Sequence, residues 1–346
     1  MKNFIEKILS ARKPYVIAEA GINHNGDKAL AKDMIDAAKE NGADCIKFQS
    51  FLADKYISKK AGRAGYQNQS NVGGKSQNEI IKATQMSQDM YRELISHANK
   101  VNIDILSTPF EVWSFRSLME LKVPAVKISS CNLTNEPFLN EIASTKIPVL
   151  ISTGMGTNEE VDRAMNIFKK SGTEIILFQC TSNYPSKIEN ANLNVLKTYQ
   201  EKYRVPVGLS DHTVTHTTCI AAIALGAIAI EKHFTLSRQL PGIDQKASIE
   251  PHELKELVIA VNDCYKALGH AVKQRTDEET DTFVALRRSL VAARDLKRGE
   301  VLAQEMIAIK RPGNGLTTSY LPQLIGKQLN RDIFEDDLFT LEDIDE

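Results

Sequence analysis

Short apolar segments rich in valine and isoleucine recur along the chain between Tyr15 and Phe234. Each is bounded by turn or cap residues, a pattern typical of a strand that is buried on both faces. Most are followed by a stretch of helical periodicity that ends at a glycine, such as ALAKDMIDAAKENG. This alternation predicts an α/β fold, the (β/α)8 or TIM barrel. The predicted strands are 15–21, 43–49, 104–110, 125–130, 149–154, 175–180, 205–211 and 227–234.

The carboxyl ends of these segments carry side chains that are able to do chemistry. In a barrel of this kind the carboxyl ends of all strands meet at one mouth, where catalytic groups lie. The sequence therefore predicts an enzyme whose site draws residues from many strands. The candidates are Glu19, Lys47, Gln49, Thr108, Lys127, Ser130, Ser152, Tyr184, Ser210, Asp211, His212 and His233.

The pattern changes after the last predicted strand. Apolar residues at helical spacing predict a closing helix that ends at Gly269, and the polar, highly charged residues 270–283 indicate a linker. Short strand-like pieces joined by turns then predict a mostly β domain. We therefore expect a barrel domain, 1–269, a linker, 270–283, and a small domain, 284–346. A domain of that size has a marginal core, so docking onto a larger body would stabilise it.

Composition argues against several classes of function. The chain has 43 basic and 44 acidic residues, a formal net charge of -1, and mixed signs along its length. No global field therefore favours nucleic acid or a membrane surface. No apolar run approaches the roughly 20 residues of a membrane helix, and the five cysteines show no CxxC spacing. We expect a cytoplasmic protein with reduced thiols and without nucleic-acid or membrane partners.

His212 and His233 follow neighbouring predicted strands. Two neutral imidazoles at adjacent strand ends can share one divalent metal ion and leave coordination positions open for substrate or water. The alternative is that either histidine is a packed or hydrogen-bonded structural residue. The pairing of the two strand ends favours the metal site.

Lys47 and Lys127 lie within apolar strands. A buried ammonium group must find an anion or lose its proton, because its desolvation is costly. With hydroxyls from neighbouring strand ends, the two lysines can form a cradle for phosphate or carboxylate. Two alternatives are structural ion pairs with Glu19 or Glu231, and a Schiff-base nucleophile at Lys127, as in lysine aldolases.

The segment 50–86 is too long for an ordinary connection between a strand and a helix. It contains only two acids, Asp54 and Glu79, and it follows the carboxyl end of a strand. A solvated insertion is the alternative, but the position and the positive charge predict a lid for an anionic substrate. The basic residues are Lys55, Lys59, Lys60, Arg63, Lys75 and Lys82.

Taken together and in this order, the motifs resemble those of the sialic acid synthase family. The resemblance covers nearly the whole chain and ends in a segment similar to the SAF (antifreeze-like) domain. The motifs are EAGINHNG, KFQ, STPF, KIS, STGM, CTSNYP, GLSDHT, LGA, IEKHFT and KRPGNG.

The resemblance implies a transferase that forms a carbon–carbon bond. Its members condense phosphoenolpyruvate with an open-chain N-acylated amino-aldose and release phosphate and a nine-carbon 2-keto acid. The resemblance also implies a homodimer in which each SAF domain caps the partner's barrel, with a divalent metal, usually Mn²⁺ and alternatively Mg²⁺ or Co²⁺.

The same resemblance implies a role for each matching residue. The metal ligands are His212 and His233, which act in catalysis together with Glu19 and Lys127. The residues implied to bind phosphoenolpyruvate are Lys47, Thr108, Lys127, Ser130, Ser152 and Ser210. Those implied to address the sugar are Glu19, Tyr184, Asp244 and Arg311. Gln49 and Asn132 complete the expected substrate-binding set.

One position departs from the family pattern. After KIS most members have an acid, as in GSGE, and here Asn132 stands in that place. An amide can hydrogen-bond but cannot take a proton or stabilise a cation by charge. A sugar-binding homologue with weakened turnover is therefore an alternative to a competent enzyme.

The identity of the sugar rests on two segments. KFQSFLADKYISKKAGRAGYQ and DQKAS resemble the legionaminic acid branch more than the N-acetylneuraminate branch. The resemblance therefore favours 2,4-diacetamido-2,4,6-trideoxymannose over N-acetylmannosamine as the substrate. We expect discrimination to rest on an apolar patch in place of a hydroxyl partner.

Overall fold

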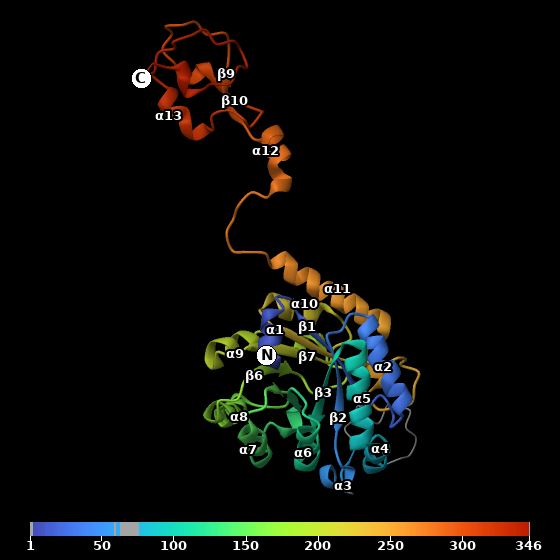
Figure 1. Cartoon of the computed structure of the whole chain (residues 1–346). Coiled ribbons are helices and arrows are strands. Elements are labelled where there is room, and N and C mark those ends of the chain that lie inside the picture. The colour runs from blue at the N-terminus through green and yellow to red at the C-terminus, as the bar shows by residue number, and fades with distance from the viewer. Residues whose placement is uncertain (1–2, 59, 63–75, 346) are drawn as a thin grey trace. The chain divides into compact units, whose positions relative to one another are not determined.

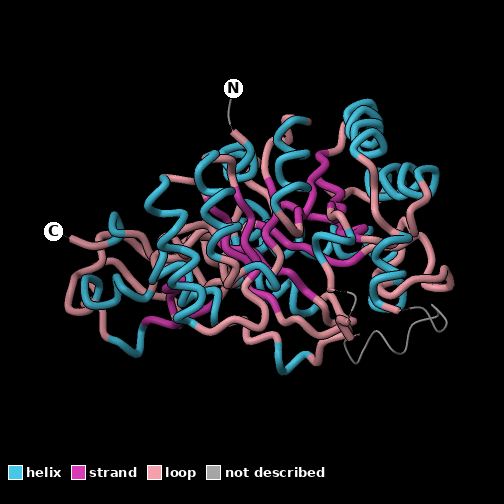
Figure 2. The backbone as a smooth tube through the Cα atoms, turned by 90° about the horizontal axis from the view of Figure 1, so that it is seen from below, coloured by secondary structure: helices cyan, strands magenta, loops and turns pink. Residues whose placement is uncertain are grey.

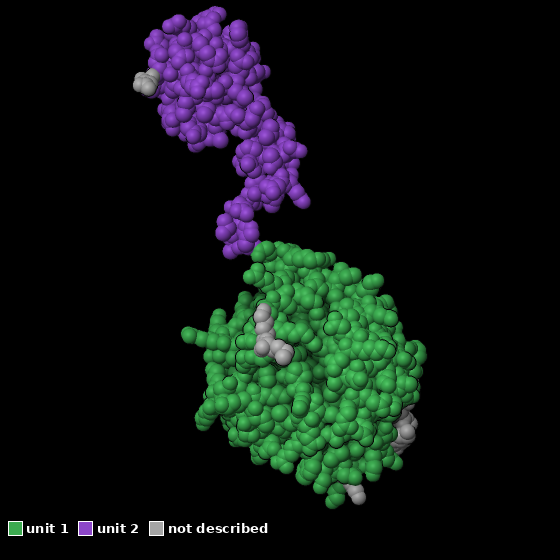
Figure 3. Space-filling model, in the orientation of Figure 1, with its two compact units in different colours: residues 1–269 green, residues 270–346 purple. Residues whose placement is uncertain are grey.

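The computed structural model describes residues 3–58, 60–62 and 76–345. These residues form two compact units, 1–269 and 270–346 (Figure 3). The first unit contains the strands and helices of the predicted barrel, and the second contains the small domain. Within the described residues, none of the helices is both long enough and apolar enough to span a membrane.

Eight parallel strands form the wall of the first unit (Figure 1). Their order is β3-β2-β1-β8-β7-β6-β5-β4, and β3 also contacts β4. The strands are β1 (Tyr15–Gly21), β2 (Cys45–Ser50), β3 (Asp104–Pro109), β4 (Val126–Ile128), β5 (Val149–Ser152), β6 (Ile175–Cys180), β7 (Val207–Asp211) and β8 (Ala229–His233). Each coincides with a predicted strand, so the predicted barrel is confirmed.

Helices follow the strands and lie around the outside of the sheet (Figure 2). Local sequence sets their ends: Thr157 caps the first turn of α8 through its side chain, and Gly172 ends that helix at a φ of 71°. The helices of this layer are α2 (Lys28–Glu40), α5 (Gln88–Val101), α6 (Val112–Glu120), α7 (Glu136–Thr145), α8 (Asn158–Ser171), α9 (Val195–Tyr203), α10 (Thr217–Ala224) and α11 (Pro251–Leu268).

The alternation of side chains along each strand divides the core into two parts. In β1, Val16 and Ala18 pack outward against the helices, whereas Ile17 packs inside the barrel. Helix α1 (Phe4–Ser10) contributes Phe4, Ile5 and Ile8 to the inner cluster. The amino-terminal half of the barrel interior is therefore filled with apolar side chains.

The segment predicted as a lid contains two short helices, α3 (Ala53–Tyr56) and α4 (Gln77–Ala83). Both contribute apolar residues to a small cluster with Ile22, Phe51 and Ile243. Of the predicted basic residues, Lys59, Arg63 and Lys75 lie outside the described part of the chain.

The second unit has its own small core, around Leu290, Leu302 and Phe339. It contains α12 (Thr280–Leu286), the antiparallel strands β9 (Ser289–Ala292) and β10 (Ile307–Lys310), and α13 (Leu321–Leu324). Single bridges such as Leu296 to Ile333 extend the β structure. Helix α12 crosses the boundary that the sequence placed between linker and domain at residues 283 and 284.

Candidate active site

A cavity of about 290 Å³ lies at the carboxyl ends of the barrel strands. It brings together residues that are far apart in the sequence, as the barrel prediction requires. The predicted site residues that line it are Glu19, Lys47, Gln49, Thr108, Lys127, Ser130, Ser152, Tyr184, Ser210, His212, His233 and Asp244. Asn132 does not line it, and Arg311 belongs to the other unit.

Four charged side chains meet at the floor of the cavity. Lys47 Nζ lies 2.6 Å from Glu19 Oε2 and 3.7 Å from Glu231 Oε1, and Lys127 Nζ lies 3.8 Å from Glu231 Oε2. All four side chains are between 3 and 7% exposed. The ion pairs expected as an alternative to an anion cradle are therefore present, and they use the same ammonium groups.

Glu231 was not among the predicted site residues. The signal that would have found it is the two-residue period of a strand, because Glu231 and His233 of β8 project to the same face. Ser210 Oγ of the neighbouring strand β7 donates to Glu231 Oε1 over 3.1 Å.

Burial and the four charges act on one another's pKa values. Burial raises the pKa of Glu19 to about 7, although Lys47 opposes the shift. Burial would also raise the pKa of Glu231, but Lys127 and Lys47 outweigh it and lower that pKa. Burial lowers the pKa of Lys127, while at Lys47 it is outweighed by Glu19 and Glu231, which raise the pKa. Lys47 therefore keeps its positive charge.

Hydroxyl groups surround the two lysines. Lys47 Nζ donates to Thr108 Oγ1 over 2.9 Å, and Lys127 Nζ donates to Ser152 Oγ. Ser130 Oγ accepts from the backbone N–H of Gly154 over 2.9 Å. These groups come from β2 to β5 and the turns that follow them, and ammonium groups with hydroxyls are suitable donors to phosphate or carboxylate oxygens.

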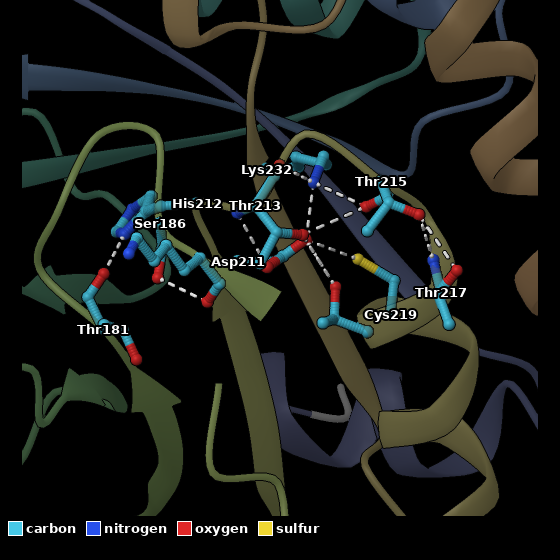
Figure 4. Close-up of polar contacts among 11 residues, drawn as sticks. Thr181, Ser186, Asp211, His212, Thr213, Thr215, Thr217, Cys219 and Lys232 are labelled. Carbon is cyan, nitrogen blue, oxygen red and sulfur yellow. Dashed lines mark hydrogen bonds and ion pairs between the residues drawn. The ribbon is translucent and has the colours of Figure 1, made fainter. Parts of the chain in front are cut away.

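The two histidines lie together under one tyrosine. The ring centroids of His212 and His233 are 5.3 Å apart, and the ring of Tyr184 lies 4.0 Å from the first and 5.4 Å from the second. His212 Nδ1 lies 2.7 Å from the carbonyl oxygen of Thr181 (Figure 4). A carbonyl only accepts, so Nδ1 carries a proton, and in the neutral ring Nε2 is the nitrogen with the lone pair.

The histidine pair fits a divalent ion with few protein ligands. Burial lowers the pKa of His233 well below its usual range, so its imidazole stays neutral, and its Nδ1 has no hydrogen-bond partner among the described residues. Within residues 3–58, 60–62 and 76–345, no group of three or more His, Cys, Asp or Glu side chains is placed to hold a metal. Two protein ligands leave positions for substrate and water.

Asp211, expected at the mouth, faces the other way. Its Oδ2 accepts from Lys232 Nζ over 2.5 Å and from Thr218 Oγ1 over 2.9 Å, and its Oδ1 accepts from Thr213 N–H over 3.1 Å (Figure 4). Lys232 also donates to the carbonyl oxygens of Thr213 and Thr215. Asp211 and Lys232 therefore fix the turn that follows β7 from outside the barrel.

The side chain of Asn132 is engaged away from the cavity. Its Nδ2 donates to the carbonyl oxygen of Phe110 over 3.2 Å, and its Oδ1 accepts from Asn135 Nδ2 over 3.2 Å. The short 3₁₀ turn Ser130–Asn132 leaves Ser130 and Cys131 in the lining and turns Asn132 out of it.

The predicted lid contributes side chains other than the expected lysines. Tyr56, Gln77 and Ile81 line the cavity, whereas Lys55 and Lys82 do not. Lys55 Nζ lies 4.7 Å from the centroid of the Trp113 ring, and Lys82 Nζ lies 3.9 Å from Asp54 Oδ2. The described part of this segment therefore presents an apolar and amide surface to the cavity.

The chain belongs to the class of barrel proteins that carry a polar site at the carboxyl ends of the strands and a small β domain after the barrel. Its residues 34–273 match the NeuB family and its residues 287–345 match the SAF domain, so the chain is a member of the NeuB family. The resemblance noted from the motifs is thus confirmed.

The alignments with several relatives cover most of this chain. The N,N'-diacetyllegionaminic acid synthase of Campylobacter jejuni is 40% identical over 330 residues, which cover 94% of this chain and 99% of that one. The synthase of the same name from Legionella pneumophila is 38% identical over 324 residues, 92% of this chain and 91% of that one. The crystal structure of N-acetylneuraminic acid synthetase from Leptospira borgpetersenii, in complex with citrate, is 34% identical, with a TM-score of 0.70, and the match covers 78% of this chain and 90% of that one.

Proposed function

We propose that this protein is a nonulosonic acid synthase that condenses phosphoenolpyruvate with an open-chain N-acylated amino-aldose. The observation that carries the proposal is the cavity, in which two buried lysines lie beside a pair of histidines at the carboxyl ends of the strands. The names of the Campylobacter and Legionella relatives favour 2,4-diacetamido-2,4,6-trideoxymannose as the sugar, ahead of N-acetylmannosamine.

Phosphoenolpyruvate would bind at the lysine side of the cavity. Lys47 and Lys127 supply two ammonium groups whose positive charge acts strongly because water is excluded. Thr108, Ser152 and Ser130 supply hydroxyl donors for the remaining phosphate and carboxylate oxygens. The same donors stabilise the charge that develops on phosphate as it leaves.

His212 and His233 would hold a divalent metal, for which we propose Mn²⁺. Bound there, the ion would polarise the aldehyde oxygen as a Lewis acid. The protein's part is to keep His212 in the Nδ1–H tautomer through Thr181 and to keep His233 neutral by burial.

The sugar would lie over the histidines and beside two buried carboxyl groups. Glu19 is held by Lys47 and by Gln49, whose Nε2 donates to it over 3.2 Å, and Asp244 is 7% exposed. Both can orient sugar hydroxyls. Carbon-3 of phosphoenolpyruvate then attacks the aldehyde carbon, water adds at carbon-2, and the bond to phosphate breaks.

A lysine aldolase is the second candidate, because the pKa of Lys127 is lowered by burial, as an amine nucleophile requires. Lys127 is, however, hydrogen-bonded to Ser152 and close to Glu231, which suits a binding role. Borohydride trapping of a pyruvate adduct at Lys127 that is insensitive to EDTA would favour the aldolase. A sugar-binding homologue without turnover is less well supported, because Asn132, the exchanged residue, does not line the cavity.

We also propose that the chain acts as a homodimer in which the SAF domain of one subunit caps the barrel of the other. Arg311 would then reach the sugar across the dimer. The proposal rests on family membership and on Arg311 lying exposed in its own unit.

Phosphate release is the direct test of the function. The protein is incubated with Mn²⁺, phosphoenolpyruvate and each of a panel of N-acyl hexosamines, and product masses are determined. We expect phosphate and a nine-carbon acid with the diacetamido sugar, and loss of both with EDTA that added Mn²⁺ reverses. Absence of phosphate release with every sugar would contradict the proposal.

A further inference from the structure

Part of the cavity lining is apolar and differs in kind from the charged floor. Ile22, Ile81, Ile243, Tyr56 and Phe110 line it, and we call these five residues the apolar wall. They pack into one cluster, and the rings of Tyr56 and Phe110 have centroids 4.6 Å apart. The wall is therefore a packed surface in which each residue supports the others.

The wall lies farther along the barrel axis than the charges do. Glu19, Lys47, Lys127 and Glu231 lie within strands, whereas Ile22 follows the end of β1, Ile81 lies on α4 and Ile243 lies in the segment after β8. A sugar that lies over the histidines with its aldehyde toward the floor can therefore extend its later carbons toward the wall.

Gln77 adds an unpaired polar group to this surface. It lies one turn before Ile81 on the same face of α4, it lines the cavity, and it is only 9% exposed. Its Oε1 is buried and has no hydrogen-bond partner among the described residues. An unpaired buried acceptor is costly, and one that faces a cavity can be satisfied by a ligand bound there.

We propose that Gln77 and the apolar wall form the subsite for the acetamido group at carbon-4 of the sugar, which rests on the function proposed above. An acetamido group carries an N–H donor, a carbonyl acceptor and a methyl group. The amide of Gln77 complements the polar pair in either orientation, and the wall accepts the methyl group. A carbon-4 hydroxyl has no methyl group for the wall and no amide to match both the donor and the acceptor of Gln77.

The test uses two sugars that differ only at carbon-4. They are 2,4-diacetamido-2,4,6-trideoxymannose and 2-acetamido-2,6-dideoxymannose, and the central variant is Gln77→Leu. We expect kcat/KM for the diacetamido sugar to fall about 10- to 100-fold, the loss of one hydrogen bond at a buried amide. The value for the 4-hydroxy sugar and the KM for phosphoenolpyruvate should change by less than about twofold.

A wall variant and a matched control accompany it. Ile81→Thr should lower kcat/KM for the diacetamido sugar about tenfold, because it places a hydroxyl against the methyl group. Asn78→Leu is the control, since Asn78 is the next residue of α4 and also has an unpaired side-chain nitrogen, but it does not line the cavity. It should leave both sugars unaffected, and thermal unfolding checks the fold of all three variants.

Two results would overturn the subsite while leaving the function intact: an equal loss for both sugars in Gln77→Leu, or a wild-type preference for the 4-hydroxy sugar. If no sugar gives phosphate release, the function itself fails. Calorimetric binding of the diacetamido sugar then decides the subsite independently. Binding that weakens tenfold or more in Gln77→Leu supports it, and binding that is absent or unchanged contradicts it.

Discussion

Two buried clusters of charge lie on opposite faces of the barrel sheet, and strand β8 contributes a residue to each. The inner cluster, defined as Glu19, Lys47, Lys127 and Glu231, faces the cavity, and the outer cluster, Asp211 and Lys232, faces away from it. Ser210 and His212 alternate with Asp211 in sequence, and Glu231 and His233 alternate with Lys232. Strand geometry alone therefore assigns neighbouring residues to separate tasks.

The clusters differ in how completely their polar atoms are paired. In the outer cluster Lys232 donates to Asp211 and to two carbonyl oxygens, and Asp211 also accepts from the turn after β7. In the inner cluster Glu231 Oε2 and Glu19 Oε2 have ion pairs but no hydrogen bond of good geometry. A fully paired network stabilises one fold, whereas open lone pairs and donors are ready for a ligand.

Removal of a lysine from the inner cluster should have the largest effect on activity. If Lys127 stabilises the leaving phosphate as proposed, Lys127→Met should lower kcat about 10³-fold or more. Its melting temperature should change little, since Glu231 keeps Lys47 and Ser210 as partners. Phosphate release and thermal unfolding measure the two effects. A variant that melts at a much lower temperature but keeps a kcat near that of the wild type would show that the inner cluster is structural.

The outer cluster should respond in the opposite way. Lys232→Met leaves the carboxylate of Asp211 buried and without its cation, so we expect unfolding to become easier by about 3–5 kcal/mol. Chemical denaturation measures this free energy. The double variant Asp211→Asn/Lys232→Met removes the unpaired charge and should recover part of the loss. Equal stability of the single variant and the wild type would contradict the structural role of this cluster.

The sequence predicted the barrel because strand and helix periods alternate eight times with clear stops. The sequence did not separate the two clusters. The residue types of Asp211 and Lys232 do not by themselves show on which face of the strand each side chain lies. The family pattern placed Asn132 at the substrate, but a 3₁₀ turn directs its side chain to Phe110. A 3₁₀ turn changes the direction in which a side chain points, and the two-residue period of a strand does not predict this change.

The apolar wall shows a second limit of sequence reasoning. An apolar patch was expected without a location, and the residues of the apolar wall include Ile22 after β1, Ile81 on the lid helix α4 and Ile243 after β8. Only tertiary packing brings Ile22, Ile81 and Ile243 together. The charge of the lid segment suggested an anion, whereas the side chains that line the cavity are those of Tyr56, Gln77 and Ile81.

The smallest expected effect concerns Arg311 in the second unit. Arg311 lies exposed in a turn that is anchored by Ser289, whose Oγ donates to the Pro312 carbonyl over 2.7 Å and accepts from Gly315 N–H over 2.9 Å. A guanidinium on an anchored turn loses little freedom when it binds sugar oxygens. If the second unit caps the partner's barrel, Arg311→Ala should raise the sugar KM about tenfold and leave the phosphoenolpyruvate KM unchanged. Steady-state kinetics measures both values.

The neighbouring residue offers a control for that experiment. Lys310 is also exposed and basic, but it pairs with Asp336 within its own unit, so Lys310→Ala should leave both KM values unchanged. A rise of both KM values in Arg311→Ala would indicate a general loss of assembly, which sedimentation velocity would reveal as monomer. Because the proposed phosphoenolpyruvate site consists of barrel residues alone, only a selective rise of the sugar KM assigns Arg311 to the sugar.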